Sequence, residues 1–147
     1  MTYQHIIVPV DGSKTSLKAV SQAALLAKAF SSKVTAVCVL TLDPFVGVEF
    51  VDVTQLSEEY EKKAQADIQQ ILDEAKQLFE AQGLEIDTKI IRGHSVHKEL
   101  VHITEQLNGD LVVIGSHGRK GFKKMVLGSV AQSLLGEIHV PVLVVRD

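Results

Sequence analysis

Three glycines and a serine in the last quarter of the sequence have the types and spacing that suit phosphate binding. Gly115, Gly118 and Gly128 are followed directly by Ser129, in the pattern G-x2-G-x9-G-S. The segment follows an apolar run typical of a strand and leads into a run typical of a helix. Glycine lets the backbone approach a ligand closely, and a helix start offers unpaired N–H groups to an anion. The pattern therefore predicts a site for the phosphates of a nucleotide.

Each residue of the pattern has a role that follows from its chemistry. Gly115 and Gly118 would bring backbone amides close to phosphate oxygens, and Gly128 would end the intervening loop. Ser129 and Val130 open the expected helix, so their N–H groups and the serine hydroxyl would bind the terminal phosphates, helped by the helix dipole. The G-x-x-G spacing alone would be better explained by a simple turn. The combination of the glycines with a strand and a helix start favours a nucleotide.

Charged and titratable side chains of the same loop could also act on an anion. His117 lies inside the first glycine pair, and its protonation at mildly acidic pH would strengthen phosphate binding. The loop is also basic, with Arg119, Lys120, Lys123 and Lys124. These four side chains would either attract anions or remain solvated, and the sequence leaves both interpretations open.

The remaining sequence alternates between strand and helix signals. Short apolar runs predict strands at residues 5–10, 33–40, 86–91, 110–114 and 140–145. Apolar residues at steps of three and four predict helices at 14–30, 55–82, 96–107 and 129–138, with Ser13 and Ser95 as possible caps. Pro9 should end the first strand, because proline cannot donate to a sheet. Residues 43–54 fit neither period and would form a packed loop or a mobile flap near the ligand.

Five strands separated by helices predict an α/β fold, with one open, doubly wound parallel sheet covered by helices on both faces. We expect the strand order 3-2-1-4-5 and a single domain over residues 1–147. Ligands bind such sheets beyond the carboxyl ends of the strands where the winding reverses, here between the first and fourth strands. These strands end at Pro9-Val10-Asp11 and at Gly115, so both segments should line one crevice. Asp11 suits hydrogen bonds from ribose hydroxyls, or a bound cation.

The composition indicates which partners and which cellular location to expect. The formal net charge is -3, which does not predict a nucleic-acid partner. No apolar run has the length of a membrane span, so membrane insertion is not expected. The one cysteine, Cys38, lies in an expected buried strand and suits packing. With no visible secretory signal, we expect a cytoplasmic protein.

Other chemistries are less well supported. A metal site built from His94, His97 and His102 is not favoured, because His97 and His102 do not share a helical face. The sequence has neither G-x-x-x-x-G-K-[ST] nor a G-x-G-x-x-G after its first strand. A phosphoacceptor receiver domain would need further acids beside Asp11. No nucleophile with an adjacent base and no paired carboxylates stand out, so no catalytic residue is named.

Four segments of the chain resemble the universal stress protein family. They are the opening His5-Ile-Ile-Val-Pro-Val-Asp-Gly-Ser13, the stretch from Asp110 to Gly118, Leu127-Gly-Ser-Val130, and the closing Val140-Pro-Val-Leu-Val-Val145. The likeness covers essentially the whole chain. The glycine pattern resembles that of the family's ATP-binding branch, whereas other members lack these glycines.

The resemblance implies a ligand, a set of contacts and an assembly. The ligand is ATP, with Mg2+ or Mn2+, and the glycine pattern holds its phosphates. The main chain at Val39 would contact the base, and Asp11 would hold the ribose together with the backbone near Pro9 and Val10. Family members usually pair through the last strand. This implies a homodimer through Val142–Val145, an apolar edge that needs covering.

Three functional hypotheses remain at this point. The first is a cytoplasmic, ATP-binding regulatory module of the stress response, whose protein partner the sequence does not reveal. The second is a weak ATPase or nucleotide hydrolase that uses the same pocket. The third is a scaffold whose crevice stays empty. The sequence also leaves open whether the ligand is ATP, AMP or another adenine compound.

Overall fold

The structure, a computed structural model, alternates strands and helices along the whole chain. It describes residues 2–41, 53–117 and 128–146. The strands are β1 (His5–Pro9), β2 (Lys33–Thr41), β3 (Asp87–Gly93), β4 (Leu111–Gly115) and β5 (Val142–Val145). The helices are α1 (Lys14–Phe30), α2 (Val53–Ala81), α3 (Val96–Gln106) and α4 (Ser129–Glu137). None of the described helices is long and apolar enough to cross a membrane.

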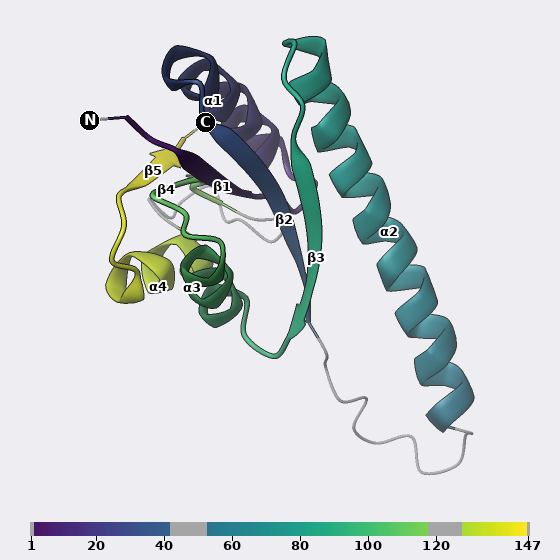
Figure 1. Cartoon of the computed structure of the whole chain (residues 1–147). Coiled ribbons are helices and arrows are strands. Elements are labelled where there is room, and N and C mark those ends of the chain that lie inside the picture. Colours follow the sequence, from purple (N-terminus) through teal and green to yellow (C-terminus); the bar gives the residue numbers. More distant parts are fainter. Residues whose placement is uncertain (1, 42–52, 118–127, 147) are drawn as a thin grey trace.

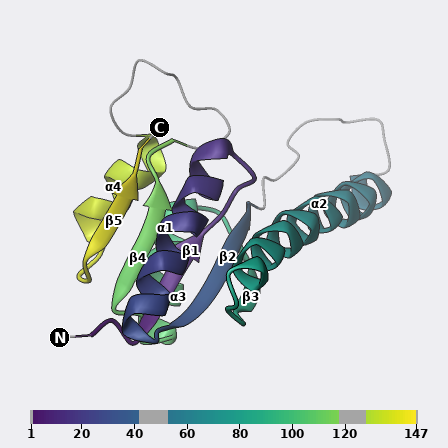
Figure 2. The same ribbon diagram turned by 90° about the horizontal axis from the view of Figure 1, so that it is seen from above.

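The strands form one parallel sheet in the order β3-β2-β1-β4-β5, which confirms the predicted α/β fold and strand order. Helices α1 and α2 lie on one face of the sheet, and α3 and α4 lie on the other (Figures 1 and 2). The chain therefore reverses its winding direction between β1 and β4. In such sheets this is the point where ligands bind.

The central strands are apolar throughout because both of their faces are covered. Ile6 and Val8 of β1 pack in the core between the sheet and helices α1 and α2. Ile7, which points to the opposite face, packs with Leu100 of α3 and Leu134 of α4. Each of the three β1 side chains has no exposed surface. This double burial explains why β1 reads as a continuous hydrophobic run instead of an alternating one.

The helix ends follow local residue chemistry, with one exception. Ser13 caps α1, since its side chain accepts a hydrogen bond of 3.2 Å from the Ser16 N–H. Gly83, with φ of +80°, follows the end of α2 in a conformation that glycine adopts without strain. Ser95 occupies the cap position of α3 but makes no side-chain cap bond there. Its hydroxyl lies 3.2 Å from Nδ1 of His97 instead.

The predicted element boundaries differ from the observed ones by a few residues. Pro9 is the last residue of β1, as predicted. The expected fifth strand over 140–145 begins only at Val142, after Pro141. Residues 43–52 of the 43–54 segment lie outside the described residues, and residues 53 and 54 belong to α2.

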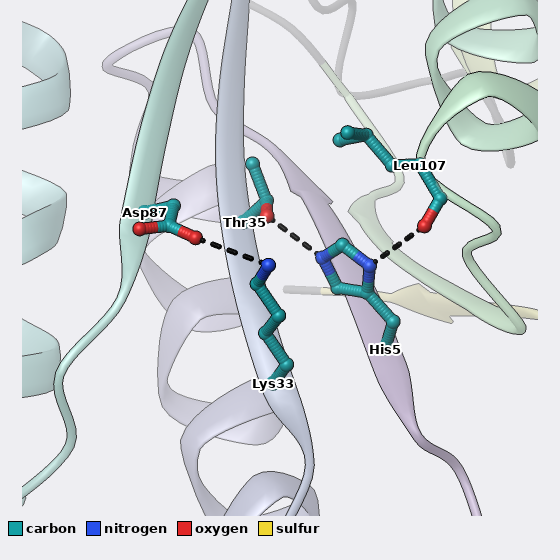
Figure 3. A network of polar contacts seen from close by, with 5 residues as sticks. All are labelled: His5, Lys33, Thr35, Asp87 and Leu107. Carbon is teal, nitrogen blue, oxygen red and sulfur yellow. Dashed lines mark hydrogen bonds and ion pairs between the residues drawn. The ribbon is translucent and has the colours of Figure 1, made fainter.

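A network of hydrogen bonds stabilises the sheet at the amino ends of its strands, where β1 and β2 begin. His5 lies between β2 and the turn after α3, with Nε2 at 2.7 Å from Thr35 Oγ1 and Nδ1 at 2.9 Å from the Leu107 carbonyl (Figure 3). Because a carbonyl only accepts, Nδ1 carries a proton and donates to Leu107, and in the neutral ring the Thr35 hydroxyl then donates to Nε2. Asp110 accepts from the backbone N–H groups of Gln4 and His5. These contacts hold β1 between its two neighbours in the sheet.

Candidate functional site

The loops that follow β1 and β4 meet at the carboxyl edge of the sheet. Strand β1 pairs with β4, so their carboxyl ends are neighbours. Gly115, the last residue of β4, packs against the first turn of α1. A Cβ atom placed on Gly115 would lie 2.9 Å from the Thr15 carbonyl carbon and 3.1 Å from the Ser16 nitrogen. Only a glycine lets the end of β4 approach the start of α1 this closely.

Gly128 brings the start of α4 to the same place. Its N–H donates to the Ser116 carbonyl at 2.6 Å, and a Cβ atom on Gly128 would lie 2.9 Å from that carbonyl oxygen. Ser129 and Val130 therefore begin α4 directly beside the end of β4. Here the role of glycine is close backbone approach, because Gly128 has an ordinary φ of -69°.

The start of α4 offers hydrogen-bond donors that the helix itself does not use. The first helical bond runs from the Gln132 N–H to the Gly128 carbonyl, at 3.1 Å. The N–H groups of Ser129 and Val130 precede it and have no acceptor within the helix. Gly128 supplies no side-chain cap, and the first turn contains no acidic residue. These features suit an anion at this helix start.

Asp11 is held in a fixed orientation on the other side of the junction. One of its carboxylate oxygens accepts a 2.9 Å hydrogen bond from the Ser13 N–H. The turn between them requires a left-handed residue, which is Gly12 with φ of +83°. The second carboxylate oxygen takes no part in this turn. Asp11 therefore presents an oriented, half-buried acceptor at the end of β1.

Val39 lies further along the same edge, on β2. The Val10 N–H donates to the Val37 carbonyl at 2.8 Å, so the backbone polar groups of Val37 face β1. Those of Val39, two residues on, face the same side. At that level β1 has already ended at Pro9. The main chain of Val39 thus points into the space beyond β1, where it can contact a ligand.

Two buried polar atoms at the junction have no hydrogen-bond partner among the described residues. They are Oγ of Ser116 and Nδ1 of His117. The Ser116 residue is only 1% exposed. Sequence reasoning named His117 but missed Ser116. The available signal was a hydroxyl placed between the last residue of an apolar strand and the glycine loop, but its burial depends on how α4 packs.

Some predicted residues do not join this junction. Gly118 and the four basic residues of the loop lie outside the described residues. His97 lies 3.4 Å from Glu137 of α4, an ion pair when the histidine is protonated. Within the described ranges, no group of three or more His, Cys, Asp or Glu residues could hold a metal ion.

A separate hollow of about 270 Å³ lies near the opposite edge of the sheet. It is lined by Thr104, Glu105, Asn108, Gly109, Ile138, His139 and Val140. None of these belongs to the predicted site. Gly109 and Val140 precede β4 and β5, whereas the predicted residues gather where the strands end.

A model of the universal stress protein family matches residues 2–146 of the chain. The chain belongs to the universal stress protein family. It is 35% identical to the universal stress protein MJ0531 of Methanocaldococcus jannaschii over 144 residues, which cover 98% of this chain and 82% of that protein. It is also 30% identical to the universal stress protein YxiE of Bacillus subtilis, with 98% and 99% covered.

Several solved structures share the fold of this chain, two of them universal stress proteins. The hypothetical protein MJ0577 superposes with a TM-score of 0.85 at 26% identity, covering 100% of this chain and 98% of its own. A universal stress protein solved in complex with cAMP gives 0.73 at 26% identity, covering 99% and 98%. The universal stress protein of Archaeoglobus fulgidus in complex with dAMP gives 0.67 at 20% identity, covering 99% of both chains. Two of these universal stress proteins were thus solved with an adenine nucleotide bound, one with cAMP and one with dAMP.

Proposed function

We propose that this universal stress protein is an ATP-binding regulatory module of the cytoplasmic stress response. The observation that carries the proposal is the junction at the carboxyl edge of the sheet. There the oriented Asp11 carboxylate, the close backbone approach at Gly115 and Gly128, and the open helix start at Ser129 come together. The adenine nucleotides in two related structures support the same class of ligand.

Each part of the nucleotide has residues suited to hold it. The main chain of Val39 would contact the base, and Asp11, with the backbone at Pro9 and Val10, would accept from the ribose hydroxyls. Backbone amides of Gly115 and Gly118 would bind the phosphates, and Gly128, whose own N–H donates to the Ser116 carbonyl, would bring the start of α4 up to them. The N–H groups of Ser129 and Val130 and the ring of His117 would add further donors. Such a set of donors neutralises a polyphosphate without requiring a catalytic group.

A divalent ion fits the same site as a companion of the nucleotide. Mg2+ prefers oxygen ligands and is often held by one carboxylate together with phosphate oxygens. The second oxygen of Asp11, which the local turn does not use, is a suitable carboxylate ligand. When bound, Mg2+ or Mn2+ would offset the negative charge of Asp11 beside the phosphates. Asp11 therefore serves either the ribose or the ion.

Titration calorimetry of the purified chain with ATP and Mg2+ tests this proposal. Gly128→Val should abolish binding, because its side chain would displace the Ser116 carbonyl that Gly128 contacts. Gly118→Val should do the same if the glycine pattern holds the phosphates. Gly136→Val, in the same helix but with no atom within 4 Å of an added Cβ, is the matched control and should keep wild-type affinity. Wild-type affinity in Gly128→Val would refute the phosphate assignment.

The same experiment separates the module from a nucleotide hydrolase. A regulatory module should hold ATP through many minutes with little phosphate release, because no base that could activate water is identified in the pocket. Sustained turnover that disappears in Asp11→Ala would assign hydrolysis instead. The proposal also includes a homodimer through the last strand.

A further inference from the structure

The Ser116 hydroxyl is an unpaired polar group in a position where proteins seldom leave one. The residue is 1% exposed, and its Oγ has no hydrogen-bond partner among the described residues. A buried hydroxyl without a partner loses its hydrogen bonds to water and gains nothing in return, so it destabilises the fold. An apolar residue such as alanine would fill the same position without this penalty. The serine is thus better explained by a partner that the described part of the chain does not supply.

The backbone of Ser116 is held rigidly on two sides. Its N–H donates to the Val145 carbonyl of β5 at 2.8 Å, and its carbonyl accepts the Gly128 N–H at 2.6 Å. Ile114 packs in the core beneath α3 and α4, and Ser116, two residues on, continues the same alternation. The side chain is therefore directed to the face that α4 covers. This arrangement leaves the hydroxyl little freedom to find another acceptor.

The surroundings of Ser116 favour an anionic partner. In the neighbouring residue His117, the ring nitrogen Nδ1 is also buried and also has no hydrogen-bond partner among the described residues. The carbonyl contact to Gly128 places Ser116 beside the start of α4, whose first N–H groups lack helical acceptors. A hydroxyl can donate one hydrogen bond, and donors that converge at a helix start suit a phosphate oxygen.

We infer that the Ser116 hydroxyl donates a hydrogen bond to a phosphate of the bound nucleotide and helps the site discriminate nucleotides from nucleosides. The inference rests on the proposed function and adds a residue to its phosphate subsite. A hydroxyl that donates to an ionised phosphate makes a stronger bond than one between neutral groups. Because Ser116 directly follows β4 and its N–H is bonded to β5, its hydroxyl would fix the phosphate relative to the sheet.

The Ser116→Ala variant gives a signature that separates a ligand contact from a packing role. We expect its ATP affinity to fall about tenfold, the usual effect of losing one hydrogen bond to a charged group. Adenosine affinity, measured by displacement of a fluorescent adenine nucleotide, should stay at the wild-type value. The thermal unfolding midpoint without ligand should be unchanged or raised, because the substitution removes a buried unpaired hydroxyl. If the serine served only in packing, the substitution would lower the unfolding midpoint and would weaken the binding of ATP and adenosine equally.

A second variant, Ser116→Cys, keeps the side-chain shape but replaces the hydroxyl by a slightly larger thiol, which is a weak donor. It should lose ATP affinity as Ser116→Ala does, at an unchanged unfolding midpoint. Wild-type ATP affinity in either variant would overturn the inference and indicate a buried water as the partner. Equal losses for ATP and adenosine, or a loss that follows a lowered midpoint, would overturn it also. If the wild-type chain binds neither ATP nor adenosine, the proposed function itself fails.

Discussion

At the scale of single residues, glycine serves two different purposes around the candidate site. Gly12 has a φ of +83°, so its backbone is left-handed and any side chain there is strained. Gly115 and Gly128 instead allow backbones to approach within contact distance. The sequence predicted a close approach of these glycines to a phosphate, whereas the structure shows a close approach between segments of the chain. Gly12 lies in a turn-like sequence after the first strand, but the sequence alone does not show that its φ is left-handed.

We predict that Gly12→Ala weakens both folding and binding. A left-handed alanine costs about 1–2 kcal/mol, so the free energy of unfolding should fall by roughly that amount in urea denaturation. Relaxing the strain would also turn Asp11 away from the Ser13 N–H, so ATP affinity should fall in calorimetry. Gly136→Ala is the control, because it adds a methyl group to open space in α4; it should preserve affinity and keep or slightly raise the free energy of unfolding. Unchanged stability and affinity in Gly12→Ala would contradict the role assigned to the turn.

At the scale of elements, the two edge strands of the sheet are protected differently. Strand β3 carries exposed charged residues along its length, Asp87, Lys89 and Arg92. Strand β5 is Val-Leu-Val-Val, has no charge, and pairs only with β4 among the described strands. Charged side chains oppose pairing with another strand, whereas an uncharged apolar edge favours it. This asymmetry supports the proposed homodimer through β5 and disfavours assembly through β3.

We expect Leu143→Glu to separate the dimer into monomers. Leu143 is 37% exposed on β5, and a charge there would be buried without a partner if two copies met at this strand. Light scattering coupled to gel filtration should give the mass of two chains for the wild type and of one chain for the variant. Lys89→Glu, an exposed charge reversal on β3, should leave the mass of the assembly unchanged. A monomeric wild type, or a variant that remains dimeric, would exclude this interface.

At the scale of the whole molecule, the alternation of elements determined most of what could be predicted. Buried strands such as β1 and amphipathic helices such as α3 predicted the fold class, which the structure confirms, and the reversal of winding predicts where the site lies. The hydrogen-bond partners of buried polar groups could not be predicted from the sequence. His5 finds Thr35 and Leu107, which are 30 and 102 residues away in the sequence, whereas Ser116 finds no described partner. Both results depend on packing between distant segments.

The His5 network lies at the amino ends of the strands, and the candidate site lies at their carboxyl ends. We therefore expect a substitution in the network to change stability without changing ligand affinity. His5→Ala at the amino edge would leave the Thr35 hydroxyl and the Leu107 carbonyl unpaired and open a cavity in the sheet. We expect the free energy of unfolding to fall by about 2–4 kcal/mol in urea denaturation, because buried groups lose their partners. ATP affinity of the folded protein, measured well below the unfolding midpoint, should remain within about twofold of wild type because His5 is distant from the strand ends. A large loss of affinity in folded His5→Ala would instead couple the two edges through β1, and would extend the functional unit from the junction to the whole strand.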